Sequence, residues 1–160
     1  MNSKTDPSND LKSLSNRELL KLMQNVTAEL KVRGAVRTKN VTGDYAEHLI
    51  SNNLNLVLET SSKKSIDAYD LHGRTYQIKS RQLSINSSTP TIKSLRSFDF
   101  DYLILVIFNP DYSINYCGKM TSALAKKLST PNPRVNGYRL NLTKKLLSNS
   151  NIEKVEINDV

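Results

Sequence analysis

The stretch Ser65-Ile-Asp-Ala-Tyr-Asp-Leu-His-Gly-Arg-Thr-Tyr-Gln-Ile-Lys-Ser-Arg81 decides how the middle of the chain folds. On both sides of His72-Gly73, polar and apolar residues alternate, which is typical of a β-hairpin. The first strand carries Asp67, and the second carries Gln77 and Lys79. The length of the turn determines which of these side chains share a face of the sheet.

Two turn lengths are compatible with this hairpin, and they pair the strands differently. A two-residue turn at His72-Gly73 would place Asp67 opposite Ile78, which divides the polar side chains between the two faces. A three-residue loop over residues 71–73 would instead place Asp67 opposite Gln77.

Turn chemistry favours the three-residue loop. Asp70 and Gly73 occupy the first and fourth positions that a type I turn prefers, and glycine readily adopts the left-handed conformation of a following bulge. In this register Asp67, Gln77 and Lys79 lie on one face, with the opposed Cβ atoms of the first two about 5 Å apart.

These side chains suit metal-assisted hydrolysis of a phosphodiester. The Asp67 carboxylate, the Gln77 side-chain carbonyl and the Ile78 backbone carbonyl are oxygen ligands of the kind that Mg²⁺ accepts, with Mn²⁺ as a possible substitute. The metal would polarise the phosphate and lower the pKa of the attacking water. Lys79 would orient that water or stabilise the pentavalent phosphate.

Glu47 is the candidate for a further oxygen ligand. It lies on a predicted helix and shares a face with Ile50 and Leu54, so it should point toward the sheet. The alternative is a structural role, because Asp44-x-x-Glu47 is also a capping pair, in which the glutamate bonds the backbone of its own helix start.

The remaining pattern predicts one α/β domain over residues 11–160, with a mixed sheet flanked by helices. Residues 1–10 have nothing to bury and are expected to be disordered. Helices are expected near 15–33, 44–54, 121–128 and 143–148, strands at 56–59, 65–71, 74–81, 102–108, 114–119 and 152–157, and loops at 82–90 and 130–137.

Two apolar patterns bear on packing. The extra N-terminal helix, which begins at the capping box Ser15-Asn-Arg-Glu18, carries Leu19, Met23, Val26 and Leu30 at helical spacing. We expect this stripe to face the core, with a dimer interface as the alternative. The run 102–108 is apolar at every position, which indicates a strand buried on both faces.

Composition limits the class of protein. In 160 residues, Lys and Arg number 23 and Asp and Glu 15, a net charge of +8 that favours a nucleic acid or another anionic partner. The single cysteine, Cys117, excludes an internal disulfide and a cysteine-rich zinc site. Because no apolar run approaches the ~20 residues of a membrane span, we expect a cytoplasmic protein without a membrane partner.

Basic residues gather in the sequence around the hairpin, as expected near a phosphate backbone. The alternative is a basic face that contacts only solvent. The candidates for contacts with DNA are Arg37, Lys63, Lys64, Arg74, Arg81, Lys93 and Arg96.

At Gly43-Asp-Tyr-Ala-Glu47, Asp67 and Gln77-Ile-Lys79, the chain resembles the PD-(D/E)XK nuclease superfamily, which has the restriction-endonuclease-like fold. The resemblance covers roughly residues 40–118. Gln77 in place of a second carboxylate is similar to the variant found in Mrr-type restriction enzymes.

This resemblance implies a metal-dependent endonuclease that acts on double-stranded DNA, and many nucleases of this kind act as homodimers. A different expectation is a catalytically inactive domain that keeps the nuclease fold and binds DNA. A third is an interaction protein whose hairpin pairs with a partner chain.

Overall fold

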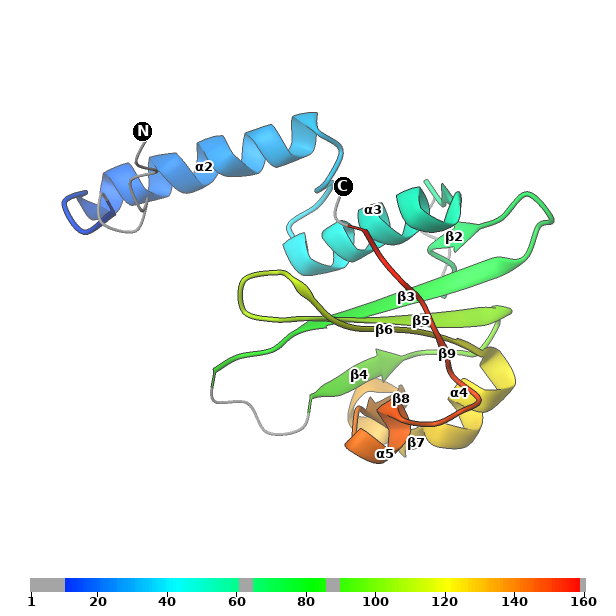
Figure 1. Cartoon of the computed structure of the whole chain (residues 1–160). Helices are drawn as coiled ribbons and strands as arrows, with labels where there is room; N and C mark the ends of the chain where they lie inside the picture. Colours follow the sequence, from blue (N-terminus) through cyan, green and yellow to red (C-terminus); the bar gives the residue numbers. More distant parts are fainter. Residues whose placement is uncertain (1–10, 61–64, 86–89, 159–160) are drawn as a thin grey trace, which may run out of the picture.

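A six-stranded mixed sheet forms the middle layer of the computed structural model, which describes residues 11–60, 65–85 and 90–158 (Figure 1). The expected disorder of residues 1–10 and the expected DNA contacts of Lys63 and Lys64 lie outside these residues. The helices are α2 (Asn16–Val32), α3 (Val41–Leu54), α4 (Ser122–Leu128) and α5 (Lys144–Leu147), with a 3₁₀ turn η1 (Pro133–Val135). The strands are β1 (Val57–Leu58), β2 (Ala68–Tyr69), β3 (Thr75–Gln82), β4 (Thr91–Leu95), β5 (Tyr102–Phe108), β6 (Ile114–Thr121), β7 (Thr130–Asn132), β8 (Gly137–Asn141) and β9 (Glu153–Lys154).

The central sheet has the strand order β1-β2-β3-β5-β6-β9. Its neighbours pair antiparallel except β3 and β5, which are parallel. A parallel pair needs a long crossover, and here residues 83–101 provide it. The crossover contains β4, which leaves the central sheet and joins a second, antiparallel sheet of order β4-β8-β7.

Strand β5 lies between two hydrophobic cores, as its uninterrupted apolar sequence predicted. Ile104, Val106 and Phe108 pack with Leu49 and other residues of α3 on one face. On the other face, Leu103, Leu105 and Ile107 pack with Ile92 and Leu95 of β4, Leu140 of β8, Ala125 of α4 and Leu146 of α5. The result is three layers, with α3 above the central sheet and the small sheet with α4 and α5 below it (Figure 1).

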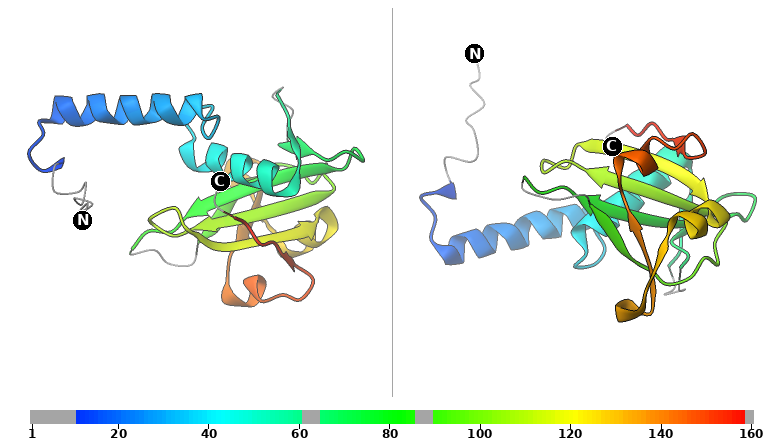
Figure 2. Two further views of the ribbon diagram at one scale, coloured as in Figure 1. Left: turned by 45° about the horizontal axis from the view of Figure 1, so that its top comes forward. Right: turned by 90° about the horizontal axis from the view of Figure 1, so that it is seen from below.

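Helix α2 lies outside these layers. Its predicted capping box is present, because the Ser15 hydroxyl accepts a hydrogen bond from the backbone of Glu18 and the Glu18 carboxylate accepts one from the Ser15 N–H. The prediction that its apolar stripe faces the core is wrong: none of its residues is buried, and Met23 and Val26 are 59% and 51% exposed. Both views of Figure 2 show α2 extending away from the layered body.

The structure also corrects the predicted positions of several helices and strands. Helix α3 begins at Val41, with Asn40 as its N-cap, so Asp44 lies inside the first turn instead of before it. Strands β2 and β9 are each limited to two residues, β7 forms within the segment predicted as a loop at 130–137, and β4 and β8 form in segments for which no strand was predicted. In the part of the chain that the structure describes, no helix has both the length and the apolar character needed to cross a bilayer.

Candidate metal and phosphate site

The hairpin has the register that its turn chemistry predicts. Ala68 pairs with Tyr76 and Tyr69 with Thr75, which sets Asp67 opposite Gln77. Residue Gly73 has a φ of +76°, and its N–H donates to the carbonyl of Asp70 at 3.0 Å. The three-residue loop is therefore confirmed, and the alternative pairing of Asp67 with Ile78 is excluded.

Asp67 is held by its neighbours on β3. Its Oδ2 atom accepts hydrogen bonds from Nε2 of Gln77 and, at 2.7 Å, from the backbone N–H of Ile78. A strand residue directs its N–H and C=O to the same side, so the Ile78 carbonyl faces the same edge as Asp67. Since Nε2 of Gln77 faces Asp67, Oε1 is the atom of this amide that is available to a cation.

The polar face of β3 lies beside an apolar face of β5. The parallel register pairs Gln77 with Leu103, Lys79 with Leu105, and Arg81 with Ile107, and paired residues share a face. The leucine side chains belong to the lower core. That core therefore ends at β3, where polar side chains open a groove toward β4 in place of further packing.

This groove, which we call the β3–β4 groove, contains two neighbouring cavities. The larger, of about 470 Å³, is lined by Glu47, and the smaller, of about 270 Å³, by Asp67 and Gln77. Lys79 of β3 and Ser94 of β4 line both. The carboxylates of Glu47 and Asp67 therefore lie in one groove, and Lys79 lines the cavity of each.

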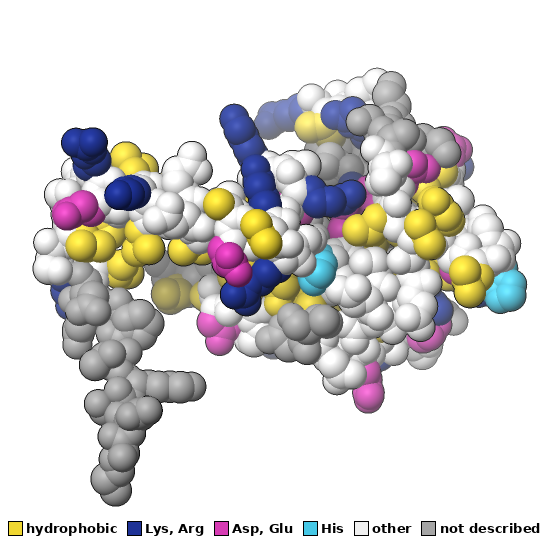
Figure 3. All heavy atoms as spheres, turned by 90° about the horizontal axis from the view of Figure 1, so that it is seen from above, with side chains coloured by type: hydrophobic (Ala, Val, Ile, Leu, Met, Phe, Trp, Pro, Cys, Tyr) yellow, Lys and Arg dark blue, Asp and Glu magenta, His cyan; other side chains and the backbone are white. Residues whose placement is uncertain are grey.

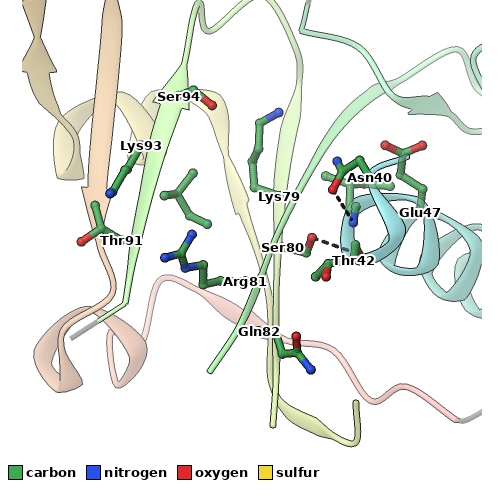
Figure 4. Close-up of a pocket in the computed structure, with 13 residues that line it drawn as sticks. Asn40, Thr42, Glu47, Lys79, Ser80, Arg81, Gln82, Thr91, Lys93 and Ser94 are labelled. Atoms are coloured by element: carbon green, nitrogen blue, oxygen red, sulfur yellow. Dashed lines mark hydrogen bonds between the residues drawn. The ribbon is translucent and has the colours of Figure 1, made fainter. Parts of the chain in front are cut away.

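Figure 4 shows the larger cavity between β3, β4 and the start of α3. The labelled side chains come from all three elements, and Lys79 and Arg81 extend from β3 into the space before β4. The full set of lining residues is Asn40, Thr42, Gly43, Glu47, Ile78, Lys79, Ser80, Arg81, Gln82, Thr91, Ile92, Lys93 and Ser94.

Hydrogen bonds fix the first turn of α3 against β3. The Asn40 side chain accepts from the N–H of Gly43 at 3.2 Å, and the Ser80 hydroxyl donates to the carbonyl of Thr42, also at 3.2 Å (Figure 4). A Cβ atom at position 43 would stand 2.1 Å from the Asn40 amide, so the Asn40 side chain would have to leave this capping position if residue 43 were not glycine. These contacts place Glu47, one turn further along the helix, beside the groove.

Glu47 has an unusual electrostatic environment. Burial and the neighbouring charge of Asp67 raise the pKa of the Glu47 carboxyl to about 7, although Arg37 opposes this shift. The Glu47 side chain is only 18% exposed, and it forms an ion pair with the Arg37 guanidinium. The expectation that Glu47 instead closes a capping pair with Asp44 is wrong, because Asn40 is the cap.

Asp44 has a structural role that the sequence did not reveal. Its buried carboxylate accepts hydrogen bonds from the backbone N–H groups of Arg37 and Thr38. These bonds fold the linker between α2 and α3 onto the first turn of α3. The Arg37 side chain is thereby directed to Glu47.

The basic candidates divide into two groups. Arg81, Lys93 and Arg96 line the cavities of the β3–β4 groove and are exposed. Arg74 does not join them: it pairs with Asp70, on the sheet face opposite Asp67, and its Nε donates to the Asp70 carboxylate at 2.6 Å. Arg37 reaches the site, but through Glu47.

The residues that sequence reasoning missed are polar side chains of β4 and of the first turn of α3. Thr91 and Ser94 reach the groove because β4 crosses under β3, and Asn40 and Thr42 reach it because α3 begins three residues earlier than predicted. An Asn-x-x-Gly signal at residues 40–43 could have identified the helix start, since asparagine is a strong N-cap.

The oxygen atoms at this site are of the type that binds Mg²⁺. Among the described residues, no three His, Cys, Asp or Glu side chains are grouped closely enough to hold a metal ion. Two carboxylates, from Asp67 and Glu47, with neutral oxygens from Gln77 and Ile78 are nevertheless hard ligands, and Mg²⁺ commonly retains several waters alongside one or two carboxylates.

Comparison with known proteins adds no family to this description. The sequence matches no protein-family model and no curated protein.

Proposed function

We propose that the chain is a Mg²⁺-dependent endonuclease that hydrolyses phosphodiester bonds of double-stranded DNA. The observation that carries this proposal is the hairpin register, which sets Asp67 opposite Gln77 and brings Lys79 to the same face. The groove in which these side chains lie is polar and bounded by the basic residues Arg81 and Lys93.

The order of elements supports a restriction-endonuclease-like fold as part of the proposal. Helix α3 carries Glu47, Asp67 directly precedes β2, and β3 carries Gln77 and Lys79, followed by the buried parallel strand β5. This is the order in which the superfamily pattern places its residues.

Each residue has a distinct role in the proposed reaction. Asp67, Gln77, the Ile78 carbonyl and Glu47 would hold Mg²⁺, which supplies charge to the phosphate and acidifies a bound water. Lys79, which lines the cavity of each carboxylate, would donate a hydrogen bond to that water or to a phosphate oxygen on which charge develops. Arg81, Lys93 and Arg96 would bind neighbouring phosphates.

Glu47 and Arg37 make metal binding and proton release interdependent. A Glu47 carboxyl with a pKa near 7 is partly protonated at neutral pH, so binding of a cation displaces a proton. The Arg37 guanidinium is a second competitor for the same carboxylate. Once displaced from Glu47, Arg37 is available to a DNA phosphate.

A second candidate function is a DNA-binding domain without catalysis. The observation that favours it is that both carboxylates already have partners in the protein, since Gln77 bonds Asp67 and Arg37 pairs with Glu47. Such pairing neutralises the site in the absence of a metal. The neutral Gln77 also leaves one negative charge fewer than a second carboxylate would provide.

Cleavage of supercoiled plasmid DNA in Mg²⁺ or Mn²⁺ separates the two functions. We expect nicked or linear product that EDTA abolishes, with rates that fall roughly 100-fold or more in Lys79→Met and Asp67→Asn. Lys154→Met, which removes an exposed lysine from β9 at the far edge of the sheet, should retain wild-type cleavage. Wild-type protein that binds DNA without cutting it would support the second candidate and refute the first.

A further inference from the structure

The row of cavities that begins at the β3–β4 groove continues past Asp67. Two further cavities, of about 310 Å³ and 430 Å³, follow the one that Asp67 lines. Arg96 lines all three, Ser65 links the Asp67 cavity to the first of the two, and Ser97 and Asp99 line both added cavities. We call the two added cavities the Arg96 trough, which adjoins the candidate metal site directly.

A bulge in β4 directs polar side chains into this row of cavities. The pairing of β4 with β8 shifts register between Ile92 and Leu95, and both of these side chains are buried in the lower core. The two residues between them, Lys93 and Ser94, are both exposed and both line the groove (Figure 4). Bulges commonly re-aim side chains in this way beside active sites. Strand β4 and the residue after it therefore supply Lys93, Ser94 and Arg96 along one path.

Two contacts hold the chain that leaves β4 beside the trough. A Cβ atom at position 137 would stand 2.6 Å from the Leu95 carbonyl oxygen, so Gly137 lets β8 lie close against the end of β4. The Ser97 hydroxyl donates a hydrogen bond to Oγ of Ser65 at 2.8 Å, which joins the loop after β4 to the segment that precedes Asp67. Ser65 can still donate its own hydroxyl hydrogen to a ligand in the trough.

The charge of the Arg96 trough suits a phosphate backbone. Arg96 and Lys126 of α4 line it and are exposed, and Asp99 is the one acidic side chain among the described residues of its lining. Lys93 and Arg96 are three residues apart, a distance of roughly 10 Å along a strand, which equals the rise of about three nucleotides of one DNA strand. The basic side chains therefore extend over more than one phosphate.

The face of the molecule that α3 covers offers fewer cations. Helix α3 contains no Lys or Arg, and in Figure 3 the basic side chains near it lie along its border. A nucleic-acid strand that leaves the candidate metal site therefore meets more positive charge along β4 and the Arg96 trough than across α3.

We propose that one strand of the bound DNA runs from the candidate metal site through the Arg96 trough. There Arg96 and Lys126 bind phosphates on the side of Asp67 away from Arg81, and the Ser65 hydroxyl donates to a phosphate oxygen. The inference rests on the proposed function and adds a second arm to its DNA interface. Contacts on both sides of the scissile phosphate fix its position at the metal, which contacts on one side alone do not.

Binding of a short labelled duplex, followed by fluorescence anisotropy in EDTA over a series of salt concentrations, tests this second arm without hydrolysis. Lys126→Gln should lower the salt-dependence slope by about 1, the loss of one phosphate contact, and Lys126→Arg should keep the wild-type slope. Lys127→Gln is the matched control, because Lys127 is also exposed in the last turn of α4 but does not line the trough. The double variant Arg81→Gln, Lys126→Gln should lower the slope by about 2, because the two residues bind different phosphates.

Asp99 gives a test of opposite sign. Asp99→Asn should tighten DNA binding roughly two- to fivefold at low salt, because its carboxylate repels phosphates in the trough. Weaker binding by Asp99→Asn, a wild-type slope in Lys126→Gln, or an equal loss of slope in Lys127→Gln would overturn the inference. If Arg81→Gln still lowers the slope in these cases, the proposed function survives. A wild type without salt-sensitive DNA binding would overturn both.

Discussion

Replacing Glu47 with glutamine should make the protein increasingly more stable than wild type as the pH rises from 5 to 8. The Glu47 carboxyl has a pKa of about 7 in the folded chain, compared with 4.5 as its ordinary value, because of burial and the charge of Asp67. Between these two values, the folded protein binds a proton that the unfolded chain has released. The free energy of unfolding of the wild type therefore decreases with pH in this range.

The size of this effect follows from the shift. A difference of about 2.5 pKa units (7 − 4.5) corresponds to about 3 kcal/mol at full ionisation. At pH 5 the glutamate of the unfolded chain is already largely ionised, so part of the loss in the free energy of unfolding is present at that pH. The remaining ~2.5 kcal/mol of the loss develops between pH 5 and pH 8. Glutamine has no titratable proton, so Glu47→Gln lacks this contribution.

Urea unfolding followed by circular dichroism, in EDTA at pH 5, 6, 7 and 8, measures the effect. Other titrating groups cancel in the difference between Glu47→Gln and wild type. Glu156→Gln removes an exposed carboxylate that follows β9 and serves as the charge-matched control. If the difference in unfolding free energy between Glu47→Gln and wild type stays constant within about 0.5 kcal/mol, Glu47 does not have the electrostatic environment described.

Four further outcomes follow from the site. Mg²⁺ affinity measured by calorimetry should rise roughly tenfold between pH 6 and pH 8 as Glu47 loses its proton, and a pH-independent affinity would contradict this. Arg37→Met should tighten Mg²⁺ binding roughly two- to fivefold at pH 9, where competition from protons for Glu47 is small; this is the strength of a partly exposed ion pair, and weaker binding would contradict competition for Glu47. Arg81→Gln should lower the salt-dependence slope of DNA binding by about 1, whereas Lys154→Gln should leave it unchanged, and equal slopes in both would remove Arg81 from the interface. Gly73→Val should destabilise the chain by at least about 1 kcal/mol in urea and Gly73→Asn by less, because the φ of +76° is left-handed; equal losses would argue against that turn.

The register of the hairpin could be predicted because it depends on local chemistry. Asp70 and Gly73 specify a turn within a few residues of each other, and alternation then assigns Asp67, Gln77 and Lys79 to one face. The buried strand β5 could likewise be predicted, since each of its residues is apolar.

Other features depend on distant contacts and could not be predicted in the same way. Strand β4 has a mixed sequence and becomes a strand because β8 pairs with it, about 45 residues later in the chain. The Arg37–Glu47 ion pair forms because the Asp44 carboxylate binds the backbone of the preceding linker. No periodic pattern in the sequence predicts this contact of Asp44. The stripe on α2 predicted a helix correctly, but periodicity does not identify the partner of an apolar face.

The central claim is that the Asp67 face of the hairpin holds a divalent metal. A crystal soaked in Mn²⁺ and measured for anomalous scattering tests it directly, because Mn²⁺ replaces Mg²⁺ and its position can be identified unambiguously. We expect a peak about 2 Å from a carboxylate oxygen of Asp67, with the Gln77 carbonyl and Glu47 turned toward it and Arg37 displaced. The same soak of Asp67→Asn should lose the peak. Mn²⁺ bound elsewhere, with the Arg37–Glu47 pair intact and no density at Asp67, would contradict the account.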